Sequence, residues 1–147
     1  MAYCNQQDLW DRFGVAEITQ ASDHDNDGLE NIEAIDAAIT DATAIINRYL
    51  YRRYVLPLAC IPAELIGLAC DIARYRLHDN RATEQIKIRY DAAIASLEMY
   101  RKRELDLFDE VCGDVFAEID GKGPVVKARA QVFTDAIFCK HVRSGAR

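Results

Sequence analysis

The sequence lacks long apolar runs, a signal-like start and paired cysteines, and each absence narrows the class of protein. No stretch approaches the ~18 uncharged apolar residues that a membrane-spanning helix requires, so no membrane span is expected. The opening Met1-Ala2-Tyr3-Cys4-Asn5 has neither the basic nor the apolar region of a signal peptide. The 5 cysteines are scattered without a C-x-x-C pair, which predicts reduced thiols in a cytosolic setting.

Basic surface is also scarce. The 147 residues carry 24 acidic and 18 basic side chains, a net charge of −6, whereas nucleic-acid-binding proteins usually present a basic face. Hydrophobic residues make up 50% of the chain, which is enough for the core of one domain. The one compact basic run is Arg101-Lys102-Arg103. It either complements the dipole at the end of a helix or contacts an acidic neighbouring chain.

Motifs of the common enzyme classes are absent as well. The chain has no Walker loop, G-x-G-x-x-G, H-E-x-x-H or G-x-S-x-G, and its histidines lie far apart. Asp71 interrupts an apolar segment, but Arg74 follows three residues later, so an ion pair is favoured over a catalytic carboxylate. Cys139 and His141 supply only two of the four ligands of a closed zinc site. We therefore expect neither an enzyme nor a bound cofactor.

The most specific local motif is an acidic loop. Asp23, Asp25, Asp27 and Gly28 fill positions 1, 3, 5 and 6 of the calcium loop D-x-[DN]-x-[DN]-G. Position 12, which should be a bidentate glutamate, is Ala34. We favour a polar turn that caps the next helix. The alternative is a weak calcium site on Asp23, Asp25 and Asp27, which would make residues 23–34 a calcium-dependent interaction module.

Hydrophobic periodicity predicts a mainly α protein, a small bundle of about four helices. The expected helices span residues 6–13, 29–54, 62–80 and about 83–104. The first helix ends at Gly14 and presents Trp10 as a core anchor, rather than as a ligand-stacking residue. The third begins at Pro62 and is apolar on nearly every side through its first half, which predicts a central position. Residues 15–22 offer only about two helical turns.

The pattern changes after residue 104. Residues 105–107 and 115–119 alternate like short strands, 120–124 resemble a turn, and 125–133 suit an extended segment. We therefore divide the chain into a helical domain, residues 1–104, and an extended, partly β C-terminal arm, residues 105–147. Arms of this kind often become ordered on a partner.

Several blocks of sequence, taken in order, resemble one family. They are Asp8-Leu9, Arg12-Phe13-Gly14, the acidic loop, Ile45-Ile46-Asn47-Arg48-Tyr49-Leu50, Arg53-Tyr54-Val55-Leu56-Pro57-Leu58 and Leu68-Ala69-Cys70-Asp71-Ile72-Ala73-Arg74-Tyr75-Arg76-Leu77. Through them, residues 2–101 resemble the phage Mu-like head–tail adaptor family of tailed phages and prophages. Gln131-Val132-Phe133-Thr134 resembles a short motif near the C-terminus of that family.

The resemblance implies a structural virion protein without catalytic residues. It implies a homo-oligomer, expected as a twelve-fold ring beneath the portal protein, that joins the DNA-filled head to a downstream neck or tail-completion protein. Packaged DNA would pass through the pore without sequence-specific binding. The expected location is the virion, and the host bacterial cytoplasm during assembly.

A ring built by rotation needs two different, complementary surfaces on each subunit. The acidic loop is one expected surface, and Arg101, Lys102 and Arg103 form the other. Phe133, in the predicted arm, is a further interface candidate.

Overall fold

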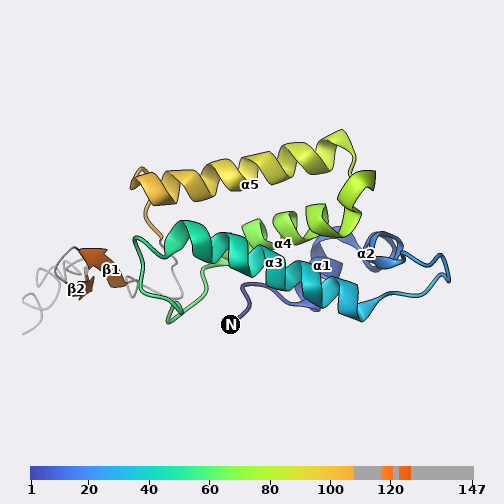
Figure 1. The fold of residues 1–147 in the computed structure, drawn as a ribbon, viewed down its shortest axis with the longest axis horizontal. Helices are drawn as coiled ribbons and strands as arrows, with labels where there is room; N and C mark the ends of the chain where they lie inside the picture. The colour runs from blue at the N-terminus through green and yellow to red at the C-terminus, as the bar shows by residue number, and fades with distance from the viewer. Residues whose placement is uncertain (108–116, 121–122, 127–147) are drawn as a thin grey trace, which may run out of the picture.

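The computed structural model describes residues 1–107, 117–120 and 123–126, which form five α-helices and a β-hairpin (Figure 1). The helices are α1 (Gln6–Phe13), α2 (Val15–Ser22), α3 (Ile32–Leu50), α4 (Ala63–His78) and α5 (Glu84–Lys102), with the 3-10 turn η1 (Asp79–Arg81) before α5. The strands are β1 (Ala117–Asp120) and β2 (Gly123–Val126). The prediction of a mainly α protein is confirmed, with one α-helix more than the four expected, because residues 15–22 form a separate helix.

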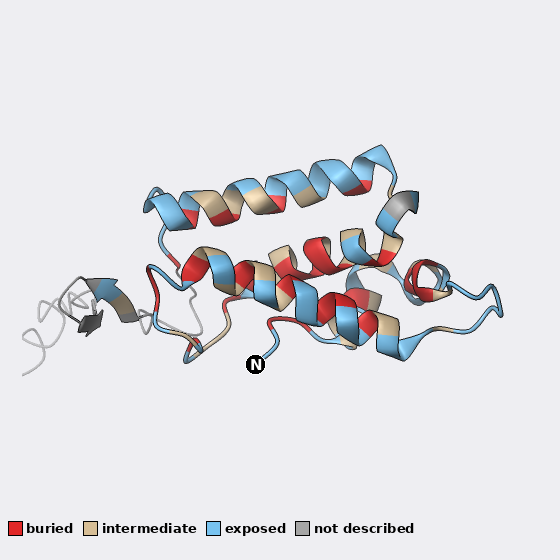
Figure 2. Cartoon of the chain, in the orientation of Figure 1, coloured by how far each residue is buried: buried red, intermediate tan, exposed pale blue. Residues whose placement is uncertain are grey.

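Helix α4 lies at the centre of the helical body. It packs against α1, α2, α3 and α5, and the buried residues of α3 and α4 face each other while the outer face of α5 is exposed (Figure 2). The fully buried side chains of this core include Leu9, Ile18, Ile35, Ile46, Leu50, Leu65, Ile72 and Leu97. Burying one such side chain stabilises the fold by ~1.5–3 kcal/mol. The central position predicted for this helix is confirmed, and Trp10 packs partly buried against the core, as expected.

Short polar signals set the helix boundaries. Asn5 and Asp8 form a capping box at the start of α1. Gly14 ends α1 and begins α2 with a φ of 88°, a conformation that glycine adopts far more readily than other residues. Asn31 caps α3 by accepting a hydrogen bond from the Ala34 N–H at 3.0 Å, so the helix starts three residues later than predicted. Thr83 caps α5 by accepting a hydrogen bond from the Ile86 N–H at 3.5 Å.

The end of α3 differs more from the prediction. The helix was expected to reach residue 54, but it stops at Leu50, and a turn carries the chain to Tyr54. There the Arg53 carbonyl accepts a hydrogen bond from the Ile119 N–H at 2.7 Å, and Tyr54 forms a β-bridge with Glu118.

The C-terminal predictions are met in part. The strand expected at 115–119 is confirmed over residues 117–119 by β1, which pairs antiparallel with β2 in a register that places Glu118 opposite Val125, whereas residues 115 and 116 lie outside the described residues. The strand expected at 105–107 is wrong, because these residues form a bend and irregular chain after α5, and Leu107 packs into the core. The division of the chain at residue 104 stays a prediction. Phe133, Cys139 and His141 lie outside the described residues.

The thiol prediction holds for two cysteines and fails for one. Cys4 and Cys70 are free and buried. The pKa of the Cys4 thiol is raised, because it is hydrogen bonded to Cys70 and buried. Cys60, in contrast, is disulfide-bonded. No helix among the residues that the structure describes is long and apolar enough to cross a membrane.

Candidate interaction surfaces

Hydrogen bonds from backbone amides of the acidic loop to its own aspartate side chains hold the loop in shape. Asp23 accepts hydrogen bonds from the Asp27 N–H (3.2 Å) and the Gly28 N–H (3.0 Å), and Asp27 accepts one from the Leu29 N–H (2.8 Å). Gly28 has a φ of 79°, which the turn requires and other residues adopt at a cost. These contacts are those of a polar turn before a helix.

The same loop shows no arrangement typical of a calcium site. Across residues 1–107, 117–120 and 123–126, no three His, Cys, Asp or Glu side chains are placed to hold a metal ion. Both Asp23 oxygens already accept loop amides. Calcium binding by Asp23, Asp25 and Asp27 stays a prediction to be tested.

Two large apolar side chains stand beside these carboxylates. Leu29 is 68% exposed and Ile32 is 50% exposed. Glu33, in the first turn of α3, adds another exposed carboxylate. A surface that combines exposed acids with exposed apolar side chains is suited to contact with another protein.

The ends of α3 and α5 lie at the opposite end of the long axis from the acidic loop (Figure 1), and both carry basic side chains. We define the basic end as Arg48 and Arg52 from the end of α3 together with Arg101, Lys102 and Arg103 from the end of α5. Arg48 and Arg101 both lie over the Tyr49 ring, at 5.8 and 5.9 Å from its centroid. The exposed Tyr51, Met99 and Leu105 add apolar surface close by. The expected basic candidates are therefore brought together with two arginines from another helix.

Arg103 is the C-cap of α5 and has a φ of 65°, in the left-handed region. Glycine or asparagine usually fills such a position, and other residues pay roughly 1–2 kcal/mol there. Arg101 and Lys102 each lie 3.8 Å from Glu98, in exposed pairs that contribute little to stability. Arg103 is therefore an exposed exception to the usual residue preference at the end of a helix.

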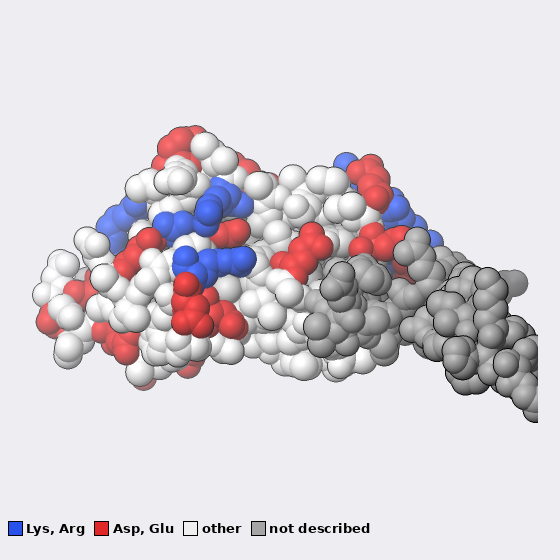
Figure 3. All heavy atoms as spheres, turned by 180° about the vertical axis from the view of Figure 1, so that it is seen from behind, with Lys and Arg blue, Asp and Glu red and all other residues white. Residues whose placement is uncertain are grey.

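Between the two ends, charges are mixed. The rear face shows Lys and Arg side chains beside Asp and Glu side chains rather than a continuous basic field (Figure 3). Glu17 on α2 pairs with Arg74 on α4 at 2.5 Å, and Arg89 on α5 lies 3.6 Å from Asp71 on α4. The predicted Asp71–Arg74 pair is therefore wrong, because each residue finds a partner on a neighbouring helix. Burial raises the pKa of Asp71, and Arg89 opposes this shift.

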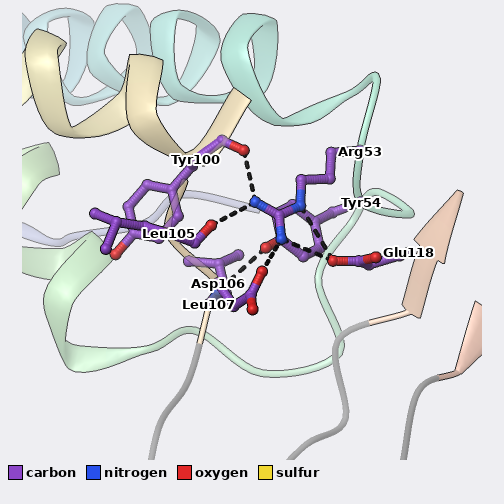
Figure 4. Close-up of polar contacts among 7 residues, drawn as sticks. All are labelled: Arg53, Tyr54, Tyr100, Leu105, Asp106, Leu107 and Glu118. Carbon is purple, nitrogen blue, oxygen red and sulfur yellow. Dashed lines mark hydrogen bonds and ion pairs between the residues drawn. The ribbon is translucent and has the colours of Figure 1, made fainter. Parts of the chain in front are cut away.

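A third feature joins the end of α3 to the chain beyond α5 (Figure 4). Arg53 is buried, with 3% of its surface exposed. Its Nε and Nη2 both donate to Glu118 Oε1, at 3.1 and 2.8 Å, and Nη2 also donates to Asp106 Oδ1. Its Nη1 donates to the carbonyl oxygens of Tyr100, at 2.7 Å, and Leu105. We call this set of contacts the Arg53 junction.

The hydrogen bonds of the Arg53 junction explain how the charged Arg53 side chain can be buried in the helical body. Burial lowers the pKa of Arg53, but hydrogen bonds to Glu118 and Asp106 and electrostatic interactions with Tyr54 and Glu118 together outweigh burial and leave the pKa raised. The neighbouring Tyr54 hydroxyl accepts a hydrogen bond from the Leu107 N–H at 3.0 Å. Sequence reasoning missed this junction. Nothing about an arginine among tyrosines and other arginines at a helix end marks it as buried.

The chain is similar in sequence to known proteins of phage Mu and a Mu-like prophage. A family model described as "Bacteriophage Mu, Gp36" matches residues 3–121. The "Mu-like prophage FluMu protein gp36" of Haemophilus influenzae is 37% identical over 101 residues, which cover 65% of this chain and 68% of that protein. "Gene product J" of Escherichia phage Mu is 35% identical over 80 residues, which cover 54% of this chain and 57% of that protein.

Proposed function

Because the chain belongs to the phage Mu Gp36 family, we propose that it is a structural virion protein that acts as a head–tail adaptor. In this role it forms a ring beneath the portal protein and joins the DNA-filled head to a neck or tail-completion protein. The twelve-fold ring, the portal and the tail-side partner are parts of the same proposal. The role rests on the resemblance of the ordered sequence blocks and on the surfaces described above.

The observation that carries the assembly role is the contrast between the two ends of the helical body. A ring arises when one surface of a subunit repeatedly meets a different surface of the next. The acidic loop presents carboxylates with Leu29 and Ile32, whereas the basic end presents five cations with Tyr51 and Met99. These surfaces are complementary in charge, and both expose apolar area for burial.

The charge balance also suits a joint through which DNA passes. The net charge is −6, and the Lys and Arg side chains of the rear face lie beside Asp and Glu side chains, so that face presents no continuous basic surface to attract phosphates (Figure 3). If the basic end is covered by the neighbouring subunit, the remaining surface repels rather than retains DNA. The proposed function therefore requires no nucleic-acid binding by the assembled ring.

Deleting the gene from the phage or induced prophage and imaging the lysate by electron microscopy tests the proposal. We expect DNA-filled or leaking heads beside complete, separate tails, and joined virions when the gene is supplied in trans. Normal joined virions without the gene would refute the adaptor role. Empty, unexpanded heads with no tails missing would instead assign the protein to an earlier step.

A further inference from the structure

We infer that Arg53 is a latch that docks β1, and the hairpin with it, onto the helical body and allows the hairpin to be released as a unit. This inference goes beyond the adaptor role and does not depend on it. It rests on the Arg53 junction, where one side chain contacts the end of α5, the chain that follows it and β1 (Figure 4).

The geometry of the guanidinium explains why one residue can hold three segments. Arginine has five N–H donors in a rigid, planar fork, and Arg53 makes five hydrogen bonds to described residues from its three side-chain nitrogens. Two of them end on backbone carbonyls near the end of α5, and three end on carboxylates. Lysine, with a single nitrogen, cannot reach the same set of acceptors.

Glu118 is the more important of the two carboxylates. Its side chain is 12% exposed, whereas that of Asp106 is 81% exposed. A buried ion pair is screened far less than an exposed one, and loss of either partner leaves an uncompensated buried charge. The docked position of β1 therefore depends on the charge of Glu118.

The backbone contacts of β1 involve the same residues as the latch. The Ile119 N–H donates to the Arg53 carbonyl at 2.7 Å, and Glu118 pairs with Tyr54 in a β-bridge. Because the side-chain and backbone contacts converge on adjacent residues, they are formed and lost together. Leu107, in contrast, is held by the Tyr54 hydroxyl and by burial in the core, so it stays in place when the hairpin leaves.

Amide hydrogen exchange of the full-length protein, measured by NMR, tests the latch. In Glu118→Gln, which keeps the shape and removes the charge, we expect exchange of the Ile119 amide to speed up by at least about tenfold, as loss of a charged hydrogen-bond partner predicts. The amides of Leu107 and of Ile72, in the centre of α4, should change by less than about twofold. Glu104→Gln is the matched control, because Glu104 is exposed and forms no ion pair among the described residues.

A second variant separates charge from geometry. Arg53→Lys keeps a cation but loses the fork, and we expect it to release Ile119 as Glu118→Gln does. If that variant does not fold, Glu118→Gln alone decides. Unchanged exchange at Ile119 in Glu118→Gln, or equal acceleration in Glu104→Gln, would overturn the inference. Equal acceleration at Ile72 and Ile119 would also overturn it, since the pair would then stabilise the whole fold.

Discussion

Reversing charges at the basic end should weaken self-association while the subunit stays folded. The triple variant Arg101→Glu, Lys102→Glu and Arg103→Glu removes the cations from the end of α5. Two unit charges about 6 Å apart in water interact by roughly 0.7 kcal/mol. Reversal turns that attraction into repulsion, so each residue that faces an acid on the neighbour should weaken association by about tenfold at low salt.

The subunit itself should tolerate this change. Arg101 and Lys102 are 49% and 54% exposed and lie 3.8 Å from Glu98, in pairs of a kind worth only ~0.2–1 kcal/mol. Acids in the last turn of a helix cost a further ~0.3–1 kcal/mol each through the helix dipole. Chemical denaturation should therefore show a loss of roughly 1–4 kcal/mol, within the range of a folded mutant.

Sedimentation of the purified full-length chain at low salt measures the association. The matched control is Arg76→Glu, Arg81→Glu and Lys87→Glu, which reverses three exposed cations near the other end of α5 that form no ion pair among the described residues. We expect the control to associate as the wild type does. Equal behaviour of the two triple variants would refute the reasoning.

A charge swap makes the assay specific for the two surfaces. Asp25→Lys with Glu33→Lys reverses exposed acids beside the loop that take no part in the hydrogen bonds of Asp23 and Asp27. This variant should also associate weakly on its own. Mixing it with the basic-end variant should restore association, because the reversed surfaces then attract each other. Failure of the mixture to associate would show that these surfaces do not meet.

Three further predictions concern the subunit alone. Burial raises the pKa of Asp71, so the fold favours the protonated carboxyl group. The contribution of Asp71 to the free energy of unfolding is therefore greatest at low pH and falls as pH rises through the folded pKa. In urea titrations, the Asp71→Asn variant should gain stability relative to wild type from about pH 4 to pH 7. A Cβ at Gly67 would lie 2.7 Å from Arg12 Nη1, the end of a flexible side chain, so Gly67→Ala should stabilise α4 by up to about 1 kcal/mol, and by more in an Arg12→Ala background; destabilisation in both backgrounds would contradict this. Calorimetric titration of the acidic loop with calcium should give millimolar affinity or none, whereas micromolar binding would revive the calcium module.

The helices were predictable because their signals are local. The apolar stripe of α3, the Gly14 cap and the Thr83 cap all lie within the segments that they shape. The boundary error at the start of α3 has a local cause too. At the start of α3, the positive φ of Gly28 keeps the chain in the loop until Asn31 can cap the helix.

The Arg53 junction was not predictable, because its partners are remote in sequence. Tyr100 lies 47 residues away and Glu118 lies 65 residues away. The same limit explains the error at Asp71 and Arg74, which sit three residues apart on one helix. Their helical spacing suggested an ion pair between them. In the folded chain, Asp71 lies close to Arg89 and Arg74 pairs with Glu17, both on neighbouring helices.

The basic end was predictable from the sequence only in part. Its run of three cations is plain in the sequence, and the dipole of α5 gives those cations a sufficient local reason. The helix dipole does not explain two features that the structure shows at this end. Arg103 occupies a left-handed position that glycine would fill at lower cost, and Arg48 and Arg101 from different helices share the ring of Tyr49. Helix stability alone requires neither, and both are compatible with the proposed contact between the basic end and an acidic neighbour, which the charge-reversal variants test.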